Sequence, residues 1–92
     1  MTEAEALKDF IGKEVVLDTR GPLVYVGRLE RVDEHFYSLA DVDVHDMSEG
    51  HSTKERYILE ARRFGVRRNR LSTLVRRLEV ISISRLEDVV EY

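Results

Sequence analysis

Short stretches of alternating hydrophobic and polar residues recur along the chain, which is the pattern of β-strands with one buried face. Turn-forming residues separate them, as at Arg20-Gly21-Pro22 between the first two stretches. Gly27 lies inside the second stretch, where a glycine usually marks a sharp bend or the close approach of another backbone. The predicted strands span residues 14–19, 23–33, 35–44, 72–76 and 79–84.

A short amphipathic helix is predicted before the first strand, over about residues 3–11. Thr2 and Glu5 have the spacing of a capping box, and Leu7 and Ile11 fall on one helical face. Gly12 follows as a residue that readily adopts the left-handed conformation at a helix end.

A long insert, residues 47–70, separates the third and fourth predicted strands, and its middle part fits two patterns. As a helix, residues 52–63 would begin with a capping box of Ser52 and Glu55 and end at Gly65. As a strand, the same residues would alternate apolar and polar side chains. Their content of Lys, Glu, Arg, Leu and Ala favours the helix.

Composition restricts the class of protein. The 92 residues, of which 42% are hydrophobic, fit one folded domain over residues 1–92. Because there are no cysteines, a disulfide framework and thiolate chemistry are excluded. The longest apolar stretches are only a few residues, so we expect no signal peptide or membrane span and a cytoplasmic location.

The net charge of −3 conceals a strong division along the chain. Residues 1–50 carry five basic and twelve acidic side chains, whereas residues 51–77 carry nine basic and two acidic ones. The basic side chains could follow the phosphates of a nucleic acid, which the interleaved Phe64 and Asn69 favour somewhat. They could also pair with the acidic residues, within one subunit or across an interface. The densest basic run comprises Arg62, Arg63, Arg67, Arg68 and Arg70.

Neither catalysis nor metal binding has a sequence signature here. No nucleophile elbow, glycine-rich phosphate loop or His-Glu-x-x-His motif occurs, so we expect a non-enzymatic protein without a cofactor. Acidic and histidine side chains gather at the end of the third strand and in the loop after it, but their spacing matches no known metal site, and we expect no metal. These residues are Asp41, Asp43, His45, Asp46, Glu49 and His51.

Two segments resemble the sequence motifs of the Sm/LSm-like family. Residues 12–17, followed by Gly27, Leu29 and Asp33, resemble the first motif, and residues 75–83 resemble the second. The similarity covers residues 3–46 and 71–84 and is of a divergent bacterial or archaeal type. It implies a small five-stranded Sm-like (SH3-like) barrel with an N-terminal α-helix, into which the chain places a long insert between strands three and four.

The resemblance also implies a function, which is to bind single-stranded RNA in a ring of six or seven subunits with a base-stacking pocket at the pore. By position, the pocket would use His35, Tyr37 and Arg76, with Asp33 supporting the loop. Tyr37 stands where the family has asparagine, so stacking would remain and uridine specificity would weaken. Tyr37 would otherwise simply pack on a strand face. The predicted RNA-binding residues are His35, Tyr37, Arg76, Arg77, Arg62, Arg63, Arg67, Arg68 and Arg70.

A second function class fits the same residues. A homo-oligomeric ring could serve as a structural or protein-interaction scaffold that binds no nucleic acid. Its arginines would then neutralise acidic neighbours, and the insert at 47–70 would offer a face to a protein partner.

Overall fold

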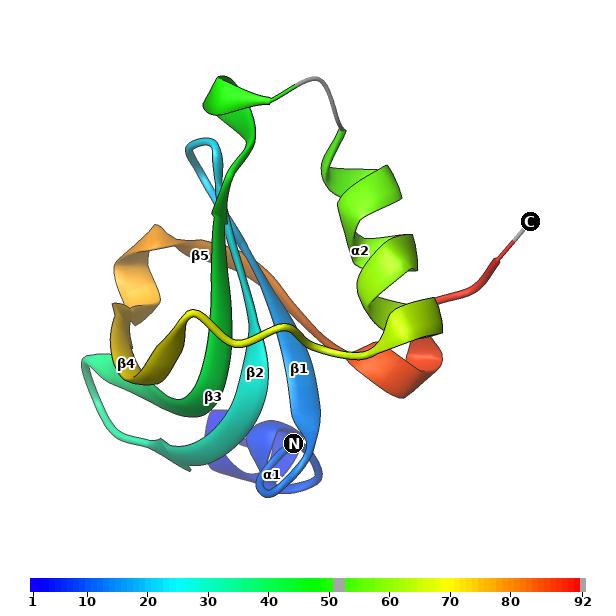
Figure 1. The fold of residues 1–92 in the computed structure, drawn as a ribbon. Helices are drawn as coiled ribbons and strands as arrows, with labels where there is room; N and C mark the ends of the chain where they lie inside the picture. Colours follow the sequence, from blue (N-terminus) through cyan, green and yellow to red (C-terminus); the bar gives the residue numbers. More distant parts are fainter. Residues whose placement is uncertain (51–52, 92) are drawn as a thin grey trace.

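The computed structural model describes residues 1–50 and 53–91, and Figure 1 shows one curled sheet with two helices beside it. All five predicted strands are confirmed to within two residues at each end. The elements are α1 (Glu3–Lys8), β1 (Glu14–Thr19), β2 (Leu23–Val32), β3 (Phe36–Asp46), α2 (Lys54–Phe64), β4 (Arg70–Arg76) and β5 (Val80–Arg85). Single 3₁₀ turns lie at Met47–Glu49, Arg77–Glu79 and Leu86–Asp88.

The N-terminal helix is shorter than predicted. Thr2 caps α1 by accepting a hydrogen bond from the Glu5 N–H at 3.1 Å, but the helix ends at Lys8 rather than at residue 11. The chain turns toward the sheet at Gly12, which has a φ of +82° and donates its N–H to the Leu29 carbonyl at 2.7 Å. This bond to β2 takes the backbone out of the helical path.

The strands form one antiparallel sheet in the order β4-β3-β2-β1-β5, so β4 and β5 are its two edges. The register between β2 and β3 shifts between Val26 and Arg28, and Asp41 in the facing strand adopts a φ of +51°. A Cβ on Gly27 would lie only 3.1 Å from the Val42 Cα. Of the two alternatives predicted at Gly27, the close backbone approach is therefore confirmed, and it coincides with an irregularity where the sheet curls.

Apolar residues gather in two clusters, one on each face of the curled sheet. Because side chains alternate along a strand, Val15 and Leu17 of β1 point into one cluster and Val16 into the other. The inner cluster contains Leu7, Val15, Leu17, Leu29, Tyr37, Leu39, Val42 and Val75. The outer one contains Val16, Val24, Val26, Tyr57, Ala61 and Leu86.

Helix α2 covers the outer cluster, which confirms the helical interpretation of the insert. Thr53 caps it by accepting from the Arg56 N–H at 3.2 Å, whereas the predicted cap Ser52 lies outside the described residues. Gly65 ends it with a φ of +88°, as expected. Figure 1 shows α2 beside β1, with residues 65–69 crossing the sheet to β4. Within the described residues, no helix is long and apolar enough to cross a membrane.

Candidate nucleic-acid interface

The two motif segments meet at one end of the sheet, around a hollow of about 840 Å³. Antiparallel pairing of β3 with β4 sets Phe36 opposite Arg76. The Arg77 N–H donates to the His35 carbonyl at 2.9 Å, which joins the loop before β3 to the turn after β4. The lining residues are Glu3, Glu34, His35, Phe36, Tyr37, Arg76, Arg77, Leu78 and Val80.

Asp33 holds the loop that carries His35. Its Oδ1 accepts hydrogen bonds from the backbone N–H groups of His35 and Phe36, both at 2.8 Å. These two bonds lower the pKa of the Asp33 carboxyl from its ordinary value. The carboxylate therefore fixes the loop through backbone contacts, which is the arrangement that a supporting role requires.

Arg76 of β4, together with the aromatic side chains of His35, just before β3, and of Phe36, its first residue, forms the accessible part of the hollow. The Arg76 Cζ lies 5.9 Å from the centre of the Phe36 ring, within cation–π distance. Arg76 is exposed and forms no ion pair with any described residue. The His35 side chain is 75% exposed. Phe36 was not among the predicted site residues, although its position next to His35 in an aromatic stretch could have indicated it.

Tyr37 and Arg77 lie deeper and already have partners. Tyr37 is 8% exposed and belongs to the inner cluster, and burial raises the pKa of its phenol. The Arg77 Cζ lies 5.7 Å from the Tyr37 ring centre. Its guanidinium also donates to the Asp33 carbonyl at 2.7 Å and forms an ion pair with Glu3 of α1. Sequence reasoning missed Glu3, because nothing local links a helix-capping segment to β4.

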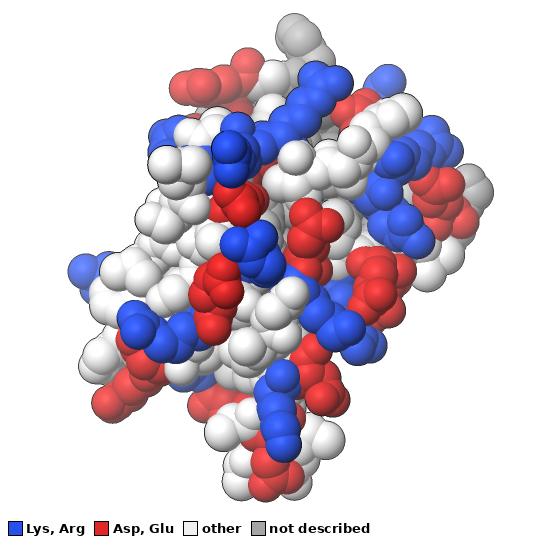
Figure 2. Space-filling model, turned by 60° about the horizontal axis from the view of Figure 1, so that its bottom comes forward, with Lys and Arg blue, Asp and Glu red and all other residues white. Residues whose placement is uncertain are grey.

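The densest basic run spans α2, the crossing segment and the start of β4, and part of it pairs with acidic residues. Figure 2 shows basic and acidic side chains interspersed over the face it presents. Arg62 and Arg63 lie on α2, and Arg63 pairs with Glu91 at 2.5 Å. Arg67, Arg68 and Arg70 lie on the crossing segment and at the start of β4, where Arg70 donates to the Asn69 carbonyl.

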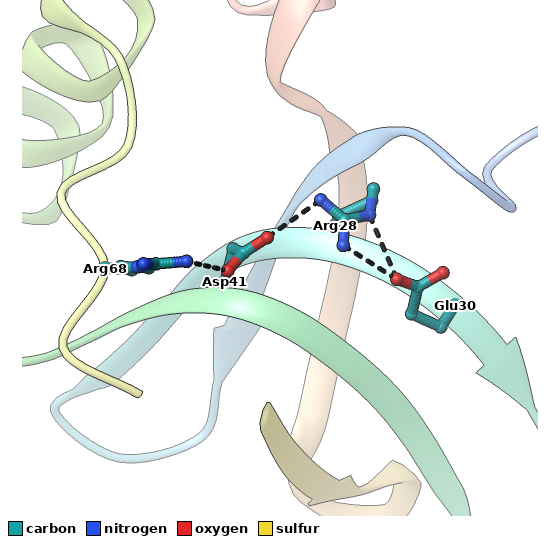
Figure 3. A network of polar contacts seen from close by, with 4 residues as sticks. All are labelled: Arg28, Glu30, Asp41 and Arg68. Atoms are coloured by element: carbon teal, nitrogen blue, oxygen red, sulfur yellow. Dashed lines mark hydrogen bonds and ion pairs between the residues drawn. The ribbon is translucent and has the colours of Figure 1, made fainter. Parts of the chain in front are cut away.

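Arg68 belongs to a network of charges across β2 and β3 (Figure 3). It donates to Asp41 at 2.6 Å, and Arg28 donates to the other carboxylate oxygen of Asp41 at 3.0 Å. Arg28 also pairs with Glu30 at 2.9 Å. Hydrogen bonds from Arg68 and Arg28 lower the pKa of Asp41. The predicted alternative, in which arginines pair with acidic residues of the first half, therefore describes Arg68 and Arg77.

Four of the six acidic and histidine residues considered as metal ligands, Asp41, Asp43, His45 and Asp46, contact other residues. The described residues contain no group of three or more that could hold a metal ion. Asn69 donates to Asp43 at 3.2 Å, and Asp46 accepts from the Ser48 N–H at 2.9 Å. His45 stacks against a tyrosine of α2. His51 lies outside the described residues.

Comparison with known proteins identifies the fold. No family model and no curated protein matches the chain. An Sm protein of Pyrococcus abyssii, solved in complex with a uridine heptamer, is 18% identical, with a TM-score of 0.63 over 92% of this chain and 99% of that one. The chain has an Sm-like fold.

The same Sm-like fold occurs in chains of the NatC complex. One, from a complex bound to Gag peptide and CoA, is 24% identical with a TM-score of 0.55 and covers 84% of this chain and 86% of its own. Another, from a complex bound to CoA, is also 24% identical, with a TM-score of 0.59 over 90% of this chain and 87% of its own.

The edges of this Sm-like sheet expose apolar side chains. Leu71 and Leu74 of β4 are 73% and 61% exposed, and Ile81 of β5 is 63% exposed. Leu78, in the turn between the two strands, is 78% exposed. Edge strands that also present apolar side chains are ready to pair with another chain.

Proposed function

We propose that the chain is a non-enzymatic, cytoplasmic Sm-like protein that binds single-stranded RNA with low sequence specificity as a homo-oligomeric ring. The observation that carries this proposal is the hollow in which His35 and Phe36 stand beside Arg76. An exposed imidazole and a half-buried phenyl ring, next to a guanidinium that forms no ion pair with any described residue, provide both base stacking and phosphate contact. The uridine heptamer bound by the neighbouring Sm protein supports the class of ligand.

Low specificity follows from which side chains remain accessible. Stacking on an imidazole or a phenyl ring accepts every base, because each base has a π face. Tyr37 stands where the resembled family has asparagine, and a phenol lacks the paired donor and acceptor of an amide. Since Tyr37 is 8% exposed, it forms the back of the hollow, and the Phe36 and His35 rings take the larger part of the stacking.

Assembly into a ring would pair the two edge strands of the sheet, β4 and β5, with neighbouring subunits. If β4 of one subunit pairs with β5 of the next, the unpaired backbone groups of both strands find partners and Leu71, Leu74 and Ile81 become buried. Each subunit then contributes one hollow. Arg62, Arg67 and Arg70 form no ion pair with any described residue and extend the basic contacts for the RNA backbone.

Fluorescence anisotropy with labelled oligo-U, oligo-A and matched DNA, at low and moderate salt, tests this function. The wild type should prefer RNA and bind less tightly as salt rises. Arg76→Ala should weaken the binding of every RNA and lower the salt slope by about one, the value for a single phosphate contact. Arg68→Ala is the matched control, since the Arg68 guanidinium already forms an ion pair with Asp41. Equal effects of the two substitutions, at unchanged ring size by sedimentation, would exclude the hollow as the binding site.

A protein-interaction scaffold is the second candidate function. The occurrence of this fold in the NatC complex favours it, as do the internal ion pairs of Arg68 and Arg77. The scaffold predicts protein that purifies without nucleic-acid absorbance and binds no oligonucleotide even at low salt. Substituting Arg67 and Arg68 should then damage assembly, which sedimentation velocity would report.

A further inference from the structure

A second hollow, of about 420 Å³, lies between α2 and β3 and shares no lining residue with the first. Side chains from β3, from the last turns of α2 and from the crossing segment converge on it. Its volume falls within the range of pockets that hold small molecules. Its principal lining side chains are Asp43, His45, Tyr57, Glu60, Phe64 and Arg67.

Aromatic rings form two walls of this hollow. The His45 and Tyr57 rings lie 4.4 Å apart between centroids and are tilted by 35°. Phe64 is the last residue of α2 and is 74% exposed. Because Gly65 ends the helix with a φ of +88°, the chain turns away directly after Phe64 and leaves its ring uncovered. An uncovered ring at the mouth of a hollow is a surface on which a flat ligand can stack.

The polar groups of the hollow include both signs of charge. Asp43 and Glu60 supply carboxylate oxygens, which only accept hydrogen bonds when ionised. Asn69 donates to Asp43 at 3.2 Å and to the Val44 carbonyl at 2.9 Å, which orients the Asp43 carboxylate. Arg67 is exposed and forms no ion pair with any described residue.

We propose that this hollow binds a second nucleotide, whose base carries an exocyclic amine and whose phosphate contacts Arg67. The inference rests on the proposed function, because it assigns another contact for the same class of ligand. The base stacks on Phe64, and its amine donates to Asp43, since Glu60 already pairs with Arg56 at 3.6 Å. Cytosine presents an amine at the position where uracil presents a carbonyl. A carboxylate accepts from the first and repels the second, so cytidine is favoured over uridine at this site.

Titration of the 92-residue protein with cytidine and uridine monophosphates, followed by saturation-transfer NMR, gives the two affinities. Wild-type protein should bind the cytidine nucleotide about 10-fold more tightly, the ratio expected for one well-made base contact. Phe64→Ala should weaken cytidine binding about 10-fold because the stacking surface is removed. Val90→Ala, at an apolar residue that is 68% exposed, is the control for removing surface area. Because Phe64 is exposed, the thermal midpoint of Phe64→Ala should stay near that of wild type.

Asp43→Asn separates base recognition from a merely structural role. An amide can donate to the uracil carbonyl as well as accept from the cytosine amine. The ratio of the two affinities should therefore fall toward one while stacking on Phe64 persists. If Asp43 had only a structural role, the substitution would weaken the binding of both nucleotides alike and leave the ratio of the two affinities unchanged.

The outcomes distinguish this inference from the proposed function. Equal affinity of wild type for the two nucleotides, or cytidine binding that Phe64→Ala does not change, would overturn the second site. Oligo-U binding that Arg76→Ala weakens would then leave the first site standing. If the protein bound neither the mononucleotides nor any oligonucleotide, both the second site and the proposed RNA binding would be refuted. If Phe64→Ala instead changed only the association between protein subunits, the surface would be a protein contact, and the inference would again fail.

Discussion

Gly27→Ala should destabilise the protein by forcing β2 and β3 apart where the sheet curls. The added Cβ would lie 3.1 Å from the Val42 Cα and 3.2 Å from the Ala40 carbonyl oxygen. Both of these are backbone atoms, so neither can rotate away. Ordinary van der Waals contacts of a Cβ lie at 3.4–4 Å, and relief therefore requires the facing strand to shift by a few tenths of an ångström.

The magnitude follows from two opposing effects. Overpacking of a tight site costs about 1–3 kcal/mol. Replacing glycine by alanine also restricts the unfolded chain, which offsets about 0.4–1 kcal/mol of that cost. The expected net loss is about 1–2 kcal/mol, equivalent to a fall of roughly 5–15 °C in the thermal midpoint of a domain this size.

Urea unfolding at a fixed protein concentration measures this loss, because assembly would otherwise change the apparent stability. Gly21→Ala is the matched control, since nothing lies within 4 Å of the added Cβ and its φ is not left-handed; it should be neutral or slightly stabilising. Gly12→Ala has equal space but a φ of +82° and should lose about 1–2 kcal/mol through strain alone. A Gly27→Ala variant as stable as Gly21→Ala would refute the close approach of the two strands.

Three further substitutions test other parts of the structure. Lys54→Met removes contacts of the ammonium group with Asp18 and with two carbonyls of the β1–β2 turn, and a loss of about 1–2 kcal/mol in urea unfolding is expected. Tyr57→Phe removes a buried hydroxyl that lies near the Asp43 carboxylate but forms no hydrogen bond of ordinary geometry with the described residues. Stability should therefore stay constant or rise, by about 1 kcal/mol at most. Asp33→Asn should make the free energy of unfolding depend less on pH in the acidic range. The folded-state pKa of Asp33 is lowered, so its contribution is complete above the unfolded pKa of about 4 and is lost as the pH falls through the folded pKa.

Each of these has a control and a contradicting result. Lys54→Arg keeps the charge and should recover part of the stability, and a neutral Lys54→Met would exclude the anchoring of α2 to the turn. Tyr57→Ala should cost about 3–5 kcal/mol by leaving a cavity, and a comparable loss in Tyr57→Phe would show that the hydroxyl has a partner. Glu34→Gln is the control for Asp33→Asn, because Glu34 belongs to the same loop but does not accept these two backbone hydrogen bonds. If Asp33→Asn left the loss of stability at acidic pH unchanged, the role of those bonds would be refuted.

Local pattern was sufficient to predict the five strands, whereas α2 fitted two patterns and was favoured only by its composition. Alternation placed all five strands, and Gly65 marked the end of α2, because both signals depend on neighbouring residues. The same holds for Gly27, whose missing side chain inside a strand indicated a close approach. The loop at Asp33 followed from the family resemblance. The end of α1 was wrong, since the bond from Gly12 to Leu29 belongs to the tertiary structure.

Only the tertiary structure decided how the charged and aromatic side chains are used. The arginines of the insert look alike in sequence, yet Arg68 meets Asp41 while Arg67 meets no acidic partner among the described residues. Which of them faces an acid depends on the path of residues 65–69 across the sheet. That path depends in turn on where α2 packs. Likewise, Tyr37 became buried and Phe36 accessible because the pairing of β3 with β4 fixes which side chains face the core, a choice made by contacts far apart in the chain.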